Sequence, residues 1–249
     1  MDAPSQAPYA ELARELADMP RQLPEAPRAI LMISAHWEEP EFTLMANPRP
    51  PMLYDYYGFP DYTYRIRYDA PGDPALAARV QALIEAAGMP ARLDAARGFD
   101  HGAFTPLHVM YPRADVPVVQ LSLKQGLDPA AHLALGRALA PLRDEGVLIV
   151  GSGLTYHNLR QFFGPRGWGP SREFDAWLRG VLLTGDPKDR ARQLAAWEAA
   201  PSARAAHPRE EHLLPLMVSV GAAEADVATL SYHEENFLGG LTVSNFRFA

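Results

Sequence analysis

Histidines are the residues of this 249-residue chain best suited to chemistry, because it contains eight of them and no cysteine. Without thiolates, a metal must be held by imidazole and carboxylate groups. His36 follows the apolar run 29–34, and His157 follows the run 147–150 across a glycine-bearing turn. Residues just beyond parallel strands form the ligand site of α/β folds. We therefore expect His36 and His157 at one catalytic edge, although an isolated histidine is more often structural.

The other histidines have weaker contexts. His101 is flanked by Gly102, which would let a ligand approach the backbone, although a turn or capping role fits nearly as well. His212 precedes an apolar segment, where the usual polarity of a helix N-terminus would explain it fully. His132 is expected on a helix, facing solvent. The remaining three have no context that favours function: His108, His207 and His233.

Several common signatures are absent from the sequence, which has no HExxH, EF-hand, P-loop or GxGxxG pattern. Gly151-Ser152-Gly153 does not match the GxSxG elbow of serine hydrolases. With a net charge of −7 and no basic run among aromatics, no nucleic-acid partner is expected. No apolar run reaches membrane length, and signal-peptide features are lacking. We therefore expect a cytoplasmic protein without a membrane partner, and leave open a homo-oligomer.

Alternating strands and helices must position these side chains. Strand-length apolar runs occur at residues 29–34, 116–123 and 147–150. Helical patterns occur at 9–19, 73–88, 128–143, 171–183, 186–199 and 210–220, and further strand-like segments at 226–232 and 241–248. Strand–helix–strand alternation predicts an α/β fold with a mostly parallel central sheet and helices on both faces. A chain of this length is expected to form a single domain.

An irregular aromatic stretch occupies residues 46–72. It contains Tyr54, Tyr56, Tyr57, Phe59, Tyr62, Tyr64 and Tyr68. Long loops without regular structure are usually functional. Two interpretations are equally good at this point: a cover packed on the core, or a lid that lines a substrate site.

A series of segments in fixed order adds a resemblance. The chain carries Ser34-Ala-His-Trp37, Tyr57-Gly-Phe-Pro60, Tyr68-Asp-Ala-Pro-Gly72, Gly98-Phe-Asp-His-Gly102, His157-Asn-Leu-Arg160 and His212-Leu-Leu-Pro-Leu216. This series resembles the class III extradiol ring-cleavage dioxygenases, specifically their DOPA-4,5-dioxygenase-like branch, over nearly the whole chain. The resemblance implies an α/β sandwich around a central sheet and one divalent metal, Zn(II) or Fe(II).

The resemblance also implies roles for individual residues. His36 and His212 are expected to bind the metal, and His157 to act as the acid/base histidine. His101 is expected to contact the substrate or to support the ligands. The aromatic stretch, with Tyr57 and Phe59, is expected to contact the substrate ring.

The activity implied by the resemblance is metal-dependent opening of a small catechol-like ring with O₂. Neutral imidazoles and oxygen donors suit such a metal, because they leave positions open for the two catechol oxygens and for O₂. Two alternatives use the same residues. A zinc hydrolase would activate water with these histidines, and a binding protein would keep the fold without the metal. Oxygen uptake and metal content would separate the three.

One departure from the family pattern concerns the N-terminus. Family members carry a further metal-binding histidine in a His-Gly-x-Pro-type motif after a first strand, upstream of a helix such as residues 9–19. Met1-Asp2-Ala3-Pro4 stands in that place here. Either Met1 is an internal methionine of a longer natural protein, or this form is catalytically impaired. Because nothing downstream departs from the pattern, we expect the first. Residues 1–249 would then form the catalytic domain without that strand and motif.

Overall fold

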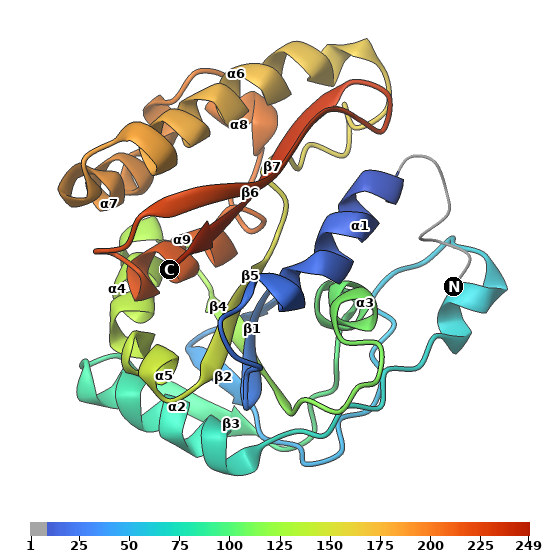
Figure 1. Cartoon of the computed structure of the whole chain (residues 1–249), viewed down its shortest axis with the longest axis vertical. Helices are drawn as coiled ribbons and strands as arrows, with labels where there is room; N and C mark the ends of the chain where they lie inside the picture. Colours follow the sequence, from blue (N-terminus) through green and yellow to red (C-terminus); the bar gives the residue numbers. More distant parts are fainter. Residues whose placement is uncertain (1–8) are drawn as a thin grey trace.

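A five-stranded sheet forms the centre of the molecule. The computed structural model describes residues 9–249 except for the Lys188 side chain, so the expectation about Met1-Asp2-Ala3-Pro4 lies outside the described residues. The strands are β1 (Ala29–Glu39), β2 (Phe42–Met45), β3 (Ala91–Asp94), β4 (Val118–Lys124) and β5 (Val147–Ser152). Their order is β3-β2-β4-β1-β5, and neighbours are parallel apart from β2 and β4 (Figure 1). This confirms the expected mostly parallel sheet.

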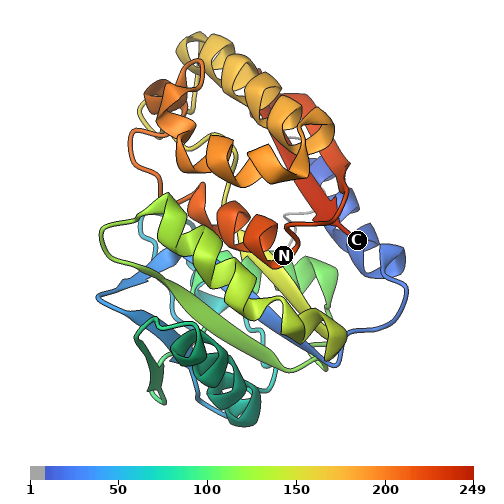
Figure 2. The same cartoon turned by 90° about the vertical axis from the view of Figure 1, so that its left-hand side faces the viewer.

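Helices cover both faces of the sheet, as expected (Figures 1 and 2). One face carries α2 (Pro74–Ala86), α4 (Pro129–Leu139), α5 (Pro141–Asp144) and α9 (Leu214–Ala222), and the other carries α1 (Ala10–Asp18) and α3 (His101–Met110). Alternation along β1 explains the two layers, since Leu31 and Ile33 join the core of α4 and α9, whereas Ile30 and Met32 pack with α3. Burial of each such side chain contributes about 1.5–3 kcal/mol.

An outer layer follows β5 in the chain and lies at the top of Figure 1. It contains α6 (Trp168–Arg179), a π-helical turn (Gly180–Thr184), α7 (Pro187–Ala195), α8 (Ala203–Ala206) and an antiparallel hairpin of β6 (Ala228–Phe237) and β7 (Leu241–Phe248). The two C-terminal strands predicted from the sequence therefore pair with each other and not with the central sheet. The Ser244 hydroxyl donates to the buried Asp175 carboxylate at 2.6 Å, which links the hairpin to α6.

Short 3₁₀ helices complete the described part of the chain at Met19–Gln22, Asp61–Arg65, Pro165–Gly167 and Trp197–Ala199. Among the helices of residues 9–249, none has both the length and the apolar composition that a membrane span requires.

Several elements differ from the sequence-based expectation. β1 continues past a register shift between Ile33 and Glu38, so His36 lies within the strand and not after it. α3 was not expected, and neither were the four-residue strands β2 and β3. The helix predicted over 128–143 is divided into α4 and α5, because Pro141 lacks the N–H that would continue it. α9 begins at Leu214, which leaves His212 in the preceding turn.

Candidate active site

Four histidines from four separate segments form a row of imidazole rings. His36 comes from β1, His101 from the first residue of α3, His157 from the loop after β5, and His212 from the turn before α9. The ring centroids of His101 and His36 are 3.9 Å apart, those of His36 and His212 are 4.9 Å apart, and those of His212 and His157 are 3.4 Å apart. The structure thus brings together all four histidines singled out in the sequence.

Glycines allow the backbone segments of this row to approach one another. A Cβ atom on Gly102 would lie 2.6 Å from both His36 Nδ1 and Ser34 Oγ, which no side chain tolerates. A Cβ atom on Gly153 would collide with the carbonyl oxygen of His212. Side chains at these two positions would therefore push His36 and His212 away from the other members of the row.

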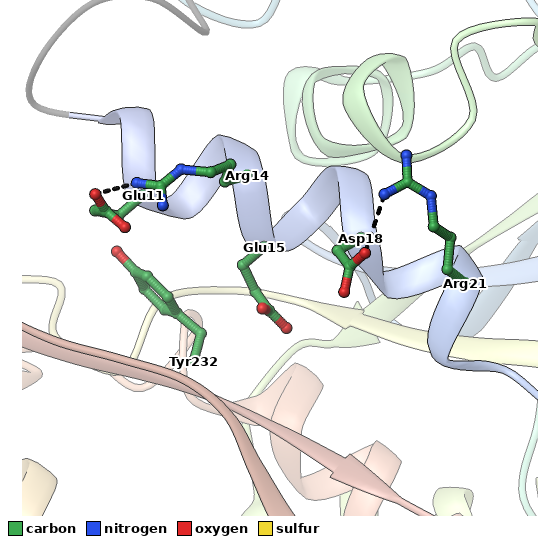
Figure 3. Close-up of a pocket in the computed structure, with 6 residues that line it drawn as sticks. All are labelled: Glu11, Arg14, Glu15, Asp18, Arg21 and Tyr232. Atoms are coloured by element: carbon green, nitrogen blue, oxygen red, sulfur yellow. Dashed lines mark hydrogen bonds and ion pairs between the residues drawn. The ribbon is translucent and has the colours of Figure 1, made fainter.

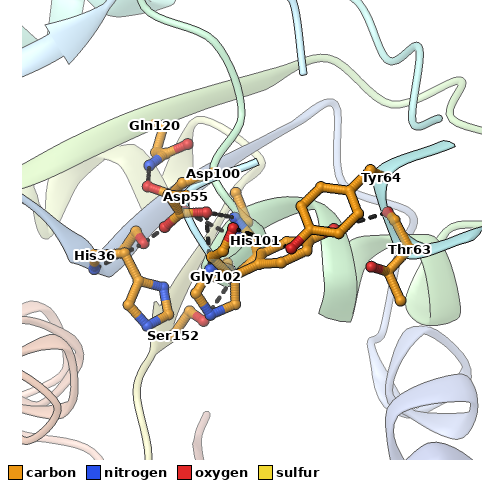
Figure 4. Close-up of polar contacts among 12 residues, drawn as sticks. His36, Asp55, Thr63, Tyr64, Asp100, His101, Gly102, Gln120 and Ser152 are labelled. Carbon is orange, nitrogen blue, oxygen red and sulfur yellow. Dashed lines mark hydrogen bonds and ion pairs between the residues drawn. The ribbon is translucent and has the colours of Figure 1, made fainter. Parts of the chain in front are cut away.

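Each outer histidine of the row is bonded to a carboxylate. Asp55 Oδ1 accepts hydrogen bonds from the backbone N–H of His101 at 2.9 Å and from its Nδ1 at 2.8 Å (Figure 4). Glu211 Oε1 lies 3.2 Å from His157 Nδ1. Burial opposes ionisation of both carboxyl groups, but the hydrogen bonds from the histidines outweigh it and lower the pKa of Asp55 and of Glu211.

The inner histidines, His36 and His212, lack such partners. Burial, with repulsion by His101, lowers the pKa of His36 to about 4, although Asp100 opposes the shift. Burial and repulsion by His157 hold the pKa of His212 well below its usual value. The Nδ1 atoms of both inner rings are buried and have no hydrogen-bond partner within the described part of the chain. Neutral imidazole is the form that binds a divalent metal, so this pair fits metal ligands.

Carboxylates lie close enough to complete a metal-binding set with the histidines. Potential ligand atoms of His36, Asp55 and His101 lie within 4.8 Å of one another, and so do those of His157, Glu211 and His212. Each set combines one inner and one outer histidine with one carboxylate, a combination typical of non-haem Fe(II) sites that zinc also accepts. Asp55 and Glu211 were not among the residues predicted from the sequence, because an isolated loop carboxylate carries no pattern. The position of Glu211 beside His212 was the one available signal.

The buried carboxylate of Asp100 holds the segment of β1 that carries His36. Asp100 is fully buried and accepts hydrogen bonds from Ser34 Oγ at 2.8 Å and from Arg97 at 2.9 Å. Gln120 also donates to it, as Figure 4 shows. Ser34 Oγ in turn accepts from the backbone N–H of His36 at 3.2 Å. Asp100 therefore positions the β1 segment that carries His36 and, as the N-cap of α3, the neighbouring His101 as well.

The remaining histidines lie outside the row. The expectation that His132 faces solvent is wrong: its ring is fully buried, its Nδ1 donates to the Asp128 carbonyl at 2.8 Å, and its Nε2 accepts from Lys124 N–H at 3.2 Å. His207 is also fully buried, with its Nε2 3.0 Å from the Thr155 carbonyl oxygen. His108 contacts the ring of Tyr68, and His233 contacts the hydroxyl of Ser244.

The aromatic stretch borders the row beside His101. The ring of Tyr56 stands edge-on to His101 at 5.4 Å and contacts Phe59 at 5.4 Å. The base of the stretch is fixed, because Leu53 N–H donates to the Phe99 carbonyl at 2.8 Å and Phe99 N–H donates to the Pro51 carbonyl at 2.9 Å. The base of the stretch is thus packed on the core, which leaves both interpretations open for its tip, where Tyr57 and Phe59 are exposed to solvent.

A separate hollow of about 420 Å³ lies between α1 and β6 (Figure 3). Its lining consists of Glu11, Arg14, Glu15, Asp18, Arg21 and Tyr232. Two ion pairs, Arg14 with Glu11 and Arg21 with Asp18, neutralise much of this lining. None of the four clustered histidines contributes to it, so we do not assign the chemistry to this hollow.

Comparisons with known proteins identify the family of this chain. Residues 1–247 match the family described as the catalytic LigB subunit of aromatic ring-opening dioxygenase. The chain is similar to 4,5-DOPA dioxygenase extradiol from Portulaca grandiflora, with 42% identity over 235 residues that cover 90% of this chain and 83% of the relative. A protein of the same name from Escherichia coli (strain K12) is 40% identical over 202 residues, covering 79% and 73%.

A solved structure is also similar. The crystal structure of an uncharacterized protein from Escherichia coli K12 matches with a TM-score of 0.77 and 32% identity, covering 94% of this chain and 91% of that one. This similarity agrees with a single-domain α/β fold. On the family match and these relatives, the chain belongs to the LigB family of aromatic ring-opening dioxygenases.

Proposed function

We propose that this protein is a metal-dependent extradiol dioxygenase that opens the ring of a catechol-type substrate with O₂. The row of four histidines is the observation that carries the proposal. The pKa values of its inner rings are lowered, and their Nδ1 atoms have no hydrogen-bond partner among residues 9–249, whereas each outer ring is bonded to a carboxylate. This division suits the reaction, which needs ligands that hold a metal and separate groups that move protons.

His36 and His212 are the metal ligands in this proposal. Their lowered pKa values favour the neutral, coordinating form at neutral pH. A carboxylate oxygen lies within 4.8 Å of each of them, from Asp55 near His36 and from Glu211 near His212. When bound, Fe(II) or Zn(II) would supply a Lewis acid that holds the two catechol oxygens and favours their ionisation.

His157 is the acid/base group in this proposal. When its Nδ1–H donates to Glu211, its Nε2 keeps a lone pair that accepts a proton from a catechol hydroxyl and later returns it. His101, held in the same way by Asp55, contacts the substrate at the other end of the row. Tyr57 and Phe59 then face the aromatic ring from the exposed tip of the cover.

The test is oxygen consumption by metal-loaded protein. Purified protein is stripped of metal, loaded anaerobically with Fe(II) or Zn(II), and mixed with catechol in aerated buffer, while an oxygen electrode and an absorbance trace follow the reaction. One O₂ consumed per catechol, with a coloured ring-opened product, is the expected result. Ester hydrolysis by the zinc form without oxygen uptake would favour the hydrolase instead. Catechol binding without metal binding would favour a binding protein.

A further inference from the structure

Exposed apolar side chains gather at the two ends of the histidine row. The most exposed large apolar residues of the described chain are Tyr57 at 91%, Phe163 at 79%, Val227 at 70%, Leu159 at 68% and Phe59 at 58%. Tyr57 and Phe59 belong to the aromatic stretch, which contacts His101. Leu159 and Phe163 lie in the turn that follows His157. Single exposed apolar residues need no explanation, but a group beside an active site indicates contact with a ligand.

We propose that Leu159, Phe162 and Phe163 form an apolar subsite for a nonpolar substituent on the catechol ring. The enzyme would accordingly favour alkyl- or aryl-substituted catechols over catechols with charged side chains. This inference rests on the proposed function, because it requires a catechol hydroxyl to lie against His157.

The geometry brings the subsite within reach of such a substrate. The Phe162 ring stands edge-on to His157, with 6.4 Å between the ring centroids, and Phe163 adjoins Phe162 at 5.8 Å. A catechol whose hydroxyl lies within hydrogen-bond distance of His157 can therefore direct a ring substituent toward Phe162. Phe163 and Leu159 are the exposed apolar residues of the same turn.

The turn that carries these residues is held in place. Asn158 is nearly buried, and its side-chain amide donates to the Ala205 carbonyl at 2.8 Å. Its side-chain oxygen accepts from Arg160 N–H at 3.2 Å, and its backbone carbonyl accepts from Gln161 N–H at 2.9 Å. A fixed turn can select among substituents, because it does not have to order itself when the substrate binds.

Charges near this end of the row are largely engaged with one another. Arg209 makes two contacts of 2.5 Å with the Glu38 carboxylate, and Glu211 is bonded to His157. Arg160, in the turn itself, is exposed and is the cation that a negatively charged substituent would meet. A preference for charged catechols would therefore depend on Arg160, and a preference for apolar ones on Leu159 and Phe163.

The experiment uses a homologous series. Catechol and its 4-methyl, 4-ethyl, 4-propyl and 4-butyl derivatives are compared with 3-(3,4-dihydroxyphenyl)propionate, in Fe(II)-loaded wild-type protein and in a Leu159→Ser/Phe163→Ser double variant. Both positions are exposed, so the double variant is expected to fold. Val227→Ser, at an equally exposed position in the turn before β6, is the matched control. The readouts are kcat/KM from oxygen uptake and Kd from anaerobic calorimetry.

We expect kcat/KM and affinity to rise with each added methylene, by up to about fourfold per step in wild type and in the Val227 control. The double variant is expected to lose this dependence on chain length. An unchanged dependence in the double variant would overturn the subsite, and so would a preference for the propionate that Arg160→Gln abolishes. If no catechol is turned over, the proposed function fails, while the anaerobic Kd series still tests the subsite. Binding of no member of the series would overturn both.

Discussion

The buried carboxylate of Asp100 offers the sharpest test of how the site is held. Asp100→Asn keeps the size of the side chain but replaces one oxygen, which can only accept, with an NH₂ group, which can only donate. Oδ1 accepts from Ser34 and from the backbone N–H of Ala103, while Oδ2 accepts from Arg97 and Gln120. The best orientation keeps the oxygen toward Ser34 and Ala103. The new NH₂ group then faces two other donors, Arg97 and Gln120.

The size of the effect follows from these contacts. Rotation of the Gln120 amide restores one contact, because its Oε1 has no partner among the described residues. The contact with the Arg97 guanidinium cannot be restored, and Arg97 is left beside a neutral group. Removing one partner of a buried ion pair costs about 3–5 kcal/mol. We therefore expect Asp100→Asn to lower the free energy of unfolding by about 3 kcal/mol or more.

Denaturant unfolding of the metal-free protein, followed by tryptophan fluorescence, measures this loss. The matched control is Asp69→Asn, because the pair of Asp69 with Arg67 has a similar distance of 2.8 Å but is exposed. Screened surface pairs contribute little, so the control is expected to unfold as wild type does. A loss below about 1 kcal/mol in Asp100→Asn would contradict this expectation, since it would mean that Arg97, whose side chain is only 17% exposed, needs no counter-charge.

Four further predictions concern the histidines and their neighbours. His36→Ala should abolish stoichiometric metal binding, measured by metal analysis, while circular dichroism shows an intact fold. His157→Ala should keep the metal and lower turnover by about 10²–10⁴-fold, whereas loss of metal would contradict its role. Gly102→Ala should weaken metal binding at least about tenfold in a competition titration, because its Cβ would displace His36, while Gly169→Ala, with no atom of the described chain within 4 Å of the added Cβ, should not. Burial lowers the pKa of His207 to about 4, so between pH 6.5 and 4 the unfolded chain binds a proton there that the folded chain does not. His207 alone should therefore lower the free energy of unfolding by about 3 kcal/mol from pH 6.5 toward pH 4, in addition to the losses from His36 and His212, whose pKa values are also lowered. The slope of unfolding free energy against pH should be shallower in His207→Gln than in wild type.

The sequence predicted the strands that carry the site better than it predicted their neighbours. Continuous apolar runs marked β1 and β5, which pointed to His36 and His157. β2 and β3 were missed because four residues are too few to show a period. α3 was missed because Pro106 interrupts its pattern, although Asp100 caps it well. The hairpin strands were found, but periodicity does not say which strand pairs with which.

Pairing between distant segments was the part of the site that the sequence could not supply. Asp55 and His101 are separated by 46 residues, and His157 and Glu211 by 54. No local pattern links such positions, so only the three-dimensional structure shows that Asp55 and Glu211 bond to these histidines. His132 shows the reverse case, because a histidine in a helical pattern looked solvated until its ring was found bonded on both nitrogens.

The continuation of β1 beyond its register shift gives the inner histidines a common support. The strand that packs against both core layers carries His36 and, two residues later, Glu38. The carboxylate of Glu38 accepts two hydrogen bonds from Arg209, which precedes His212 by three residues. His36 lies on this strand, and the turn that carries Glu211 and His212 is tied to it through Arg209, whereas His101 takes its orientation from Asp55 in the aromatic stretch. Motion of the aromatic stretch would then change the orientation of His101 while the turn of His212 stays tied to β1. In the proposed function, substitutions in that stretch could accordingly change substrate preference while both proposed metal ligands keep their support.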